Sequence, residues 1–109
     1  MNLEPIKNAL LTATSDVSHY EAVGKTDKYI VWAEDSQYDS QWSDDSMNIQ
    51  IIEGTVDYFT RTENDPNVDK IQSALNKVCS WRLNSVQYED DTRYIHYEWL
   101  WRLEHGLES

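Results

Sequence analysis

The change of hydrophobic period within residues 65–103 constrains the fold of this chain more than any other feature. Asp65 is a favourable helix N-cap, and Pro66 suits the first helical position, where no backbone N–H is needed. Apolar residues then recur at spacings of three and four, which places one stripe on a helix. The stripe consists of Val68, Ile71, Ala74, Leu75 and Val78. Over residues 81–88 and 95–103 the period becomes two. This pattern predicts an amphipathic helix followed by an antiparallel hairpin that packs against it.

The hairpin pattern assigns side chains to two faces. In its first strand, Trp81, Leu83 and Ser85 alternate with Arg82, Asn84, Val86 and Tyr88. In its second strand, Tyr97, Trp99 and Trp101 lie on one face, and Tyr94, His96 and Glu98 lie on the other. This is more aromatic surface than one helix can cover, so we expect part of it to contact a partner, in particular another copy of the chain.

The earlier part of the chain predicts a further helix and three strands. A short amphipathic helix is expected over residues 3–12, and strands are expected over residues 17–22 and 28–34. The longest strand is expected over residues 47–62, with a bulge or bend near Gly54. Because short polar turns join most neighbouring strands, we expect an α+β fold with a mainly antiparallel sheet of about five strands and two helices. The predicted order is helix-strand-strand-strand-helix-strand-strand.

At 109 residues the chain is expected to form one domain, 1–109, around one core. Residues 35–46 include four Asp and four Ser, which predicts a mobile acidic loop because such a segment buries little apolar area. Its two aromatic residues, Tyr38 and Trp42, are candidate anchors that order on docking. Residues 104–109 are expected to form a flexible tail.

The net charge of −11 arises from twenty Asp and Glu against nine Lys and Arg, and no segment is basic. Direct binding to a nucleic-acid backbone is therefore not expected, although an acidic surface can either repel DNA or imitate it. The single cysteine, Cys79, excludes an internal disulfide and is expected to be a structural thiol. No apolar run approaches the ~20 residues of a membrane span, and no signal peptide is recognisable. We expect a soluble, unexported protein without membrane contact.

The sequence offers few residues for catalysis or metal binding. His19, His96 and His105 lie too far apart in the sequence for a zinc motif, and the acidic loop lacks the pattern of an EF-hand. Neither a glycine-rich phosphate loop nor a Gly-x-Ser-x-Gly motif is present. Glu98 and Asp57 could form a carboxylate pair on neighbouring strands, but solvated strand carboxylates are far commoner. We therefore expect no catalytic residues, no metal and no cofactor, and interpret the chain as a binding or structural module.

Four segments resemble the lambda-like tail terminator class, which comprises small tail-completion proteins of long-tailed phages and prophages. They are residues 29–34 (YIVWAE), 54–60 (GTVDYFT), 64–75 (NDPNVDKIQSAL) and 88–99 (YEDDTRYIHYEW). The resemblance covers roughly residues 3–103. It implies an antiparallel sheet flanked by helices and a hexameric ring that ends the tail tube and takes part in head–tail joining. The implied partners are further copies of the chain, the tail tube protein and the head–tail connector protein, and the implied locations are the virion and, during assembly, the host cytoplasm.

The acidity of the chain is compatible with this role, because DNA must pass through such a ring without binding to it. The resemblance implies no catalytic residue. The candidate interface residues are Tyr38, Trp42, Tyr94, His96 and Glu98. The alternative function from a different class is an acidic inhibitor that imitates DNA and binds a basic enzyme, which the charge alone suggests.

Overall fold

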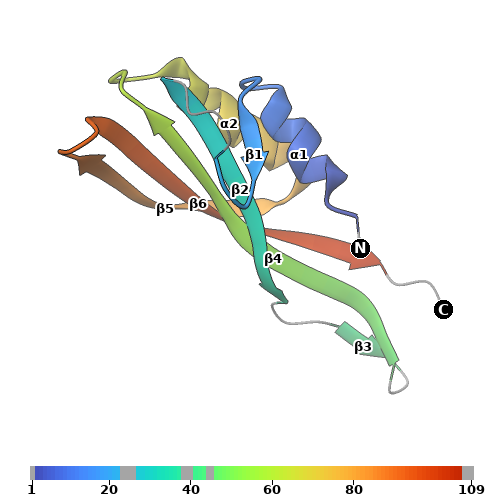
Figure 1. Cartoon of the computed structure of the whole chain (residues 1–109). Coiled ribbons are helices and arrows are strands. Elements are labelled where there is room, and N and C mark those ends of the chain that lie inside the picture. Colours follow the sequence, from blue (N-terminus) through green and yellow to red (C-terminus); the bar gives the residue numbers. More distant parts are fainter. Residues whose placement is uncertain (1, 23–26, 38–40, 44–45, 107–109) are drawn as a thin grey trace.

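The computed structural model describes residues 2–22, 27–37, 41–43 and 46–106 (Figure 1). Within these residues, two helices and six strands follow one another. They are α1 (Glu4–Leu11), β1 (Val17–His19), β2 (Lys28–Gln37), β3 (Gln41–Ser43), β4 (Ser46–Thr60), α2 (Pro66–Val78), β5 (Ser80–Glu89) and β6 (Tyr94–Gly106). Neither helix is long and apolar enough to span a membrane, as far as the described part of the chain extends.

The strands form one sheet in the order β1-β2-β4-β6-β5, and β3 pairs with β4 outside this path. All pairings are antiparallel except that of β1 with β2, which is parallel. Both helices lie on the same face of the sheet (Figure 1), because Leu10 of α1 and Leu75 of α2 belong to one buried cluster. The predicted α+β fold, its mainly antiparallel sheet and its order of elements are confirmed.

Helix α2 begins as its sequence predicts. The carboxylate of Asp65 accepts a hydrogen bond from the backbone N–H of Asn67 at 2.9 Å, which satisfies one of the free donors of the first turn. Ile71, Ala74 and Leu75 are buried against the sheet. The apolar stripe of α2 therefore supplies the core, as its spacing indicates.

The core is dominated by the tryptophans of β6. Trp99 and Trp101 are both 0% exposed. Each indole N–H also has an acceptor: Trp99 Nε1 lies 3.1 Å from Gln72 Oε1 of α2, and Trp101 Nε1 lies 3.1 Å from the Thr55 carbonyl oxygen. A buried donor without a partner would destabilise the fold by about 1–3 kcal/mol, so these contacts fix both rings. These two residues therefore belong to the core and not to the aromatic surface that is left for a partner.

Gly54 is required by a close approach between strands rather than by a bulge in its own strand. A Cβ atom at this position would lie 2.0 Å from the Ala33 carbonyl oxygen and 2.6 Å from the ring of Trp101. The bulge lies opposite, in β2, where the register shifts between Glu34 and Ser36. The irregularity was thus predicted in the right region but on the wrong strand.

Three expected boundaries are wrong, two of them because backbone segments with polar side chains pair with long strands. The expected loop 35–46 instead continues β2 to Gln37 and forms β3, while residues 38–40 and 44–45 lie outside the described residues. The expected tail 104–109 continues β6 to Gly106, since residues 104–106 pair with β4; residues 107–109 are not described. The expected strand 17–22 ends at His19. Hydrogen bonding to a neighbouring strand does not require apolar side chains.

Candidate interaction surfaces

The sheet presents one face to the helices and another, here called the open face, away from them. The open face is not covered by any helix of the described chain. Its central rows come from β2, β4, β6 and β5 and can be read from the strand register. They are Tyr29, Phe59, His96 and Gln87; Val31, Asp57, Glu98 and Ser85; and Ala33, Thr55, Leu100 and Arg82.

An aromatic cluster fills one end of the open face. Tyr29 stacks on Phe59 with ring centroids 4.7 Å apart, and Phe59 stacks on His96 at 4.3 Å. Tyr94 meets Tyr29 edge-on at 5.6 Å, and the Arg61 guanidinium lies 4.2 Å from the centroid of the Tyr94 ring. As a result Tyr94 is only 7% exposed. Tyr94 lies on the predicted face, but it offers little surface to a partner.

His96 is held by Asp57, because Nε2 of the imidazole lies 2.7 Å from Oδ1 of the carboxylate. This hydrogen bond raises the pKa of His96; partial burial opposes the increase, and the charges of Asp57, Glu89 and Glu98 support it. Asp57 and Glu98 lie directly opposite each other on the neighbouring strands β4 and β6. Each carboxylate has its own partner, however, since Glu98 accepts a hydrogen bond from the Asn84 amide at 2.7 Å. The arrangement is a paired polar surface.

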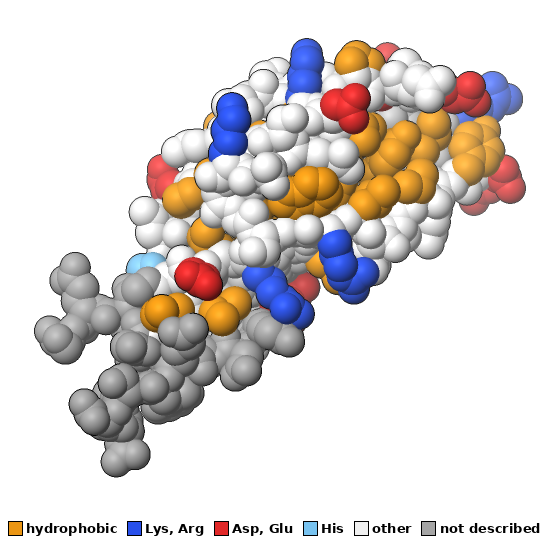
Figure 2. Space-filling model, turned by 180° about the vertical axis from the view of Figure 1, so that it is seen from behind, with side chains coloured by type: hydrophobic (Ala, Val, Ile, Leu, Met, Phe, Trp, Pro, Cys, Tyr) orange, Lys and Arg blue, Asp and Glu red, His pale blue; other side chains and the backbone are white. Residues whose placement is uncertain are grey.

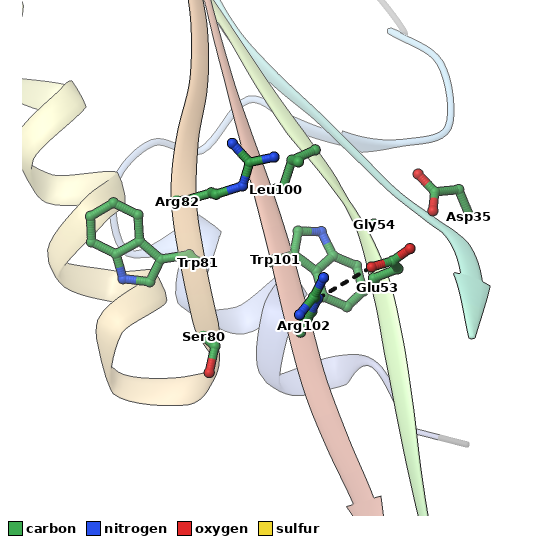
Figure 3. Close-up of a pocket in the computed structure, with 9 residues that line it drawn as sticks. All are labelled: Asp35, Glu53, Gly54, Ser80, Trp81, Arg82, Leu100, Trp101 and Arg102. Atoms are coloured by element: carbon green, nitrogen blue, oxygen red, sulfur yellow. Dashed lines mark hydrogen bonds and ion pairs between the residues drawn. The ribbon is translucent and has the colours of Figure 1, made fainter. Parts of the chain in front are cut away.

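A hollow of about 260 Å³ lies on the open face between β2, β4, β6 and β5 (Figure 3). Its charged residues are Asp35, Glu53, Arg82 and Arg102. Nε of Arg102 lies 3.3 Å from Oε2 of Glu53, and Figure 3 shows this pair beside the buried Trp101. Two cations and two anions compensate one another here. The hollow can therefore take a partner segment of mixed character, with Leu100 as an apolar contact.

The helix side of the sheet carries a hydrophobic surface that α2 does not reach. Leu83 is 42% exposed, Val86 is 50% exposed and Tyr88 is 61% exposed, and all three belong to the edge strand β5. Figure 2, which views the molecule from behind, shows hydrophobic side chains that continue toward the end of the β5–β6 hairpin. We call Leu83, Val86 and Tyr88 the hydrophobic band.

Strict alternation along β5 had missed this band. Alternation placed Leu83 on one face and Val86 and Tyr88 on the other. In the structure the register shifts between Leu83 and Ser85, so Asn84 is an extra residue. Leu83 then pairs with Trp99 and Val86 pairs with Tyr97, two residues that share the helix-facing side. The bulge therefore brings the three apolar side chains together, and no Gly or Pro marks it in the sequence.

The helices differ in charge from the rest of the molecule. Within α1 and α2, three lysines (Lys7, Lys70 and Lys77) stand against Glu4 and Asp69, which gives a net charge of +1. Because the whole chain has a net charge of −11, the remaining residues together have a net charge of −12. The two helices are thus less acidic than the rest of the sequence, and the sequence order conceals this because the lysines are scattered.

The other candidate residues are placed as follows. Tyr38 lies outside the described residues; Trp42 belongs to β3, but its side chain also lies outside them. Cys79 is partly buried, and burial raises the pKa of its thiol to about 11, as suits a structural cysteine. Within the ranges that the structure describes, no group of three or more His, Cys, Asp or Glu could hold a metal ion.

Comparison of the chain with models of protein families and with curated protein sequences finds no match. The resemblance to tail terminators therefore depends on the four sequence segments quoted above.

Proposed function

We propose that this chain is a structural protein of a phage or prophage tail that ends the tail tube and takes part in head–tail joining. It acts through contacts between proteins, as one subunit of a homo-oligomeric ring that the family resemblance puts at six copies. The observation that carries the proposal is the hydrophobic band, which is an apolar surface on an edge strand and alternates with polar residues along it.

The band is large enough to form the centre of a subunit contact. Complete burial of an apolar side chain contributes about 1.5–3 kcal/mol, so covering the exposed halves of three such side chains contributes roughly 2–4 kcal/mol. Association also loses several kcal/mol of translational and rotational freedom. The band must therefore act together with surrounding polar and charged contacts, which is the usual arrangement of a protein interface.

The charge supports a ring through which DNA passes. A ring of six copies would carry about six times the charge of one chain, and this field repels a duplex over a Debye length of ~8 Å. The alternative, an inhibitor that imitates DNA, is supported by the charge alone.

The proposal is tested by adding the purified protein to polymerising tail tube protein and measuring tube length by negative-stain microscopy. The wild-type chain is expected to bind tube ends and to stop growth. Tyr88→Ser in the hydrophobic band should weaken this effect. Tyr20→Ser is the matched control, because Tyr20 is 62% exposed but lies outside the band. Analytical ultracentrifugation measures ring formation in parallel.

A chain that neither forms rings nor binds tube ends would contradict the proposal. In that case the acidic-inhibitor alternative predicts salt-sensitive binding to a basic nuclease, with an affinity that decreases steeply as salt is added. Sedimentation of the two proteins together at low and at high salt separates these outcomes.

A further inference from the structure

The two sides of this molecule differ in a way that predicts how two copies meet. The helix side carries the hydrophobic band and helix α2, whose Asp69, Lys70 and Lys77 give it a net charge of +1. The open face combines partly buried apolar residues such as Leu100 and Ala33 with an excess of carboxylates. Two copies that turned the same side toward each other would bring like charges together, which is unfavourable.

The helix side offers free positive charge. Lys70 and Lys77 are seven residues apart on α2, and with Thr12 at the end of α1 they line a shallow hollow of about 280 Å³. Neither lysine forms an ion pair with another residue in the described ranges.

The open face offers the matching negative charge. Four carboxylates and two arginines lie around its hollow and along its centre. The carboxylates are Asp35, Glu53, Asp57 and Glu98, and the cations are Arg82 and Arg102. These six side chains together have a net charge of −2. The open face is also hollowed between β2, β4, β6 and β5, which leaves room for side chains of a docked copy.

We propose that the helix side of one copy docks on the open face of the next copy, with Lys70 and Lys77 facing the carboxylates of that face. This inference rests on the proposed function and specifies its subunit contact. Because the two surfaces differ, the contact is heterologous, and its repetition generates a closed ring or an open filament rather than a two-fold dimer. It also explains how copies with a charge of −11 can associate.

Charge reversal tests the pairing of the two surfaces. Lys77→Glu alters the helix side and Glu98→Lys alters the open face, and each should weaken self-association about tenfold at low salt, since like charges then meet across the contact. Mixing the two variants should restore association, because in an alternating assembly every contact again joins opposite charges. Arg93→Glu is the control, since it is exposed in the β5–β6 turn and lies on neither surface.

Sedimentation velocity at two ionic strengths measures these changes, and circular dichroism verifies that each variant folds. Asp35→Lys, at an exposed position beside the hollow, replaces Glu98→Lys if the latter does not fold. Association that is unchanged in both variants, or that mixing does not restore, overturns this inference while a ring-forming wild type leaves the proposed function intact. A wild-type chain that stays monomeric and does not bind tail tubes contradicts both.

Discussion

Replacing Asp65 by alanine removes one acceptor that four donors share. Oδ1 of Asp65 accepts from the backbone N–H of Asn67 at 2.9 Å, and Oδ2 accepts from Tyr58 Oη at 2.8 Å and Thr60 Oγ1 at 2.7 Å. Lys28 Nζ lies 3.3 Å from Oδ2, and the Asp65 side chain is 0% exposed. The carboxylate therefore connects the N-terminus of α2 to the end of β4, which precedes it in the chain, and to the more distant strand β2.

The expected loss of stability follows from these contacts. Loss of an N-cap side chain costs about 1 kcal/mol. The hydroxyls of Tyr58 and Thr60 then remain buried without their acceptor, at about 1–3 kcal/mol each. The ammonium of Lys28 is 38% exposed and can be solvated, so it adds little. We expect Asp65→Ala to lower the free energy of unfolding by about 3–7 kcal/mol, a large share of the stability of an ordinary domain.

Urea unfolding at pH 7, followed by tryptophan fluorescence, measures this loss because Trp99 and Trp101 are buried only in the folded chain. Asp69→Ala is the control: it removes a carboxylate from the same helix turn, at an exposed position, and should cost only a few tenths of a kcal/mol. Asp65→Asn keeps a capping side chain and should fall between the two. A cost of only about 1 kcal/mol for Asp65→Ala would refute the role of the buried hydroxyls.

The acid dependence of the same variant has a definite sign. Burial raises the pKa of Asp65, but hydrogen bonds from Thr60, Asn67, Tyr58 and Lys28 outweigh it and hold that pKa below its ordinary value of 3.8. The stabilisation by the carboxylate is therefore fully present above the unfolded-state pKa and is lost as the pH falls through the folded-state pKa. The difference between wild type and Asp65→Ala should be constant from about pH 5 to 7 and should shrink in stronger acid.

Three further predictions concern other parts of the sheet. Gly54→Ala should lower the melting temperature measured by circular dichroism, because its Cβ would lie 2.0 Å from the Ala33 carbonyl oxygen and overpacking costs about 1–3 kcal/mol or more. Cys79 should react with a disulfide reagent much more slowly in native protein than in urea at pH 8, since its pKa is raised to about 11. Asp57→Asn should lower the pKa of His96 in an NMR titration; the wild-type pair stabilises the fold below the unfolded-state pKa and loses this effect as the pH rises through the raised folded-state value.

Local physical chemistry was sufficient for α2. The Asp65 cap, Pro66 in the first turn and the apolar stripe all act within a few residues of one another, and the structure confirms them. Strand faces were also predictable where the alternation is regular, as in β6, where Trp99 and Trp101 share the buried side. The fold class follows because these elements leave few ways to arrange one core.

Features that depend on distant partners could not be predicted. The bulge at Asn84 depends on how β5 pairs with β6, and it moved Val86 and Tyr88 to the side opposite to the one that alternation indicates. Tyr94 was assigned to the correct face, but Arg61, from the segment after β4, covers its ring. Alternation gives the face of a side chain, whereas its exposure depends on neighbours from elsewhere in the chain.

The extra residue in β2 divides that strand into two parts with different freedom to change in evolution. Before the bulge, Ile30 and Trp32 are buried in the core and pair with residues of β4. An insertion or deletion in this part would shift their register and disturb the core. After the bulge, Ser36 and Gln37 pair with a part of β4 that runs toward β3 and away from the helices (Figure 1). An insertion or deletion beyond position 35 shifts the register only of this outer part. Descendants of this sequence can therefore alter the length and chemistry of the β2–β4 connection, and so adapt to new partners, while the core keeps its packing.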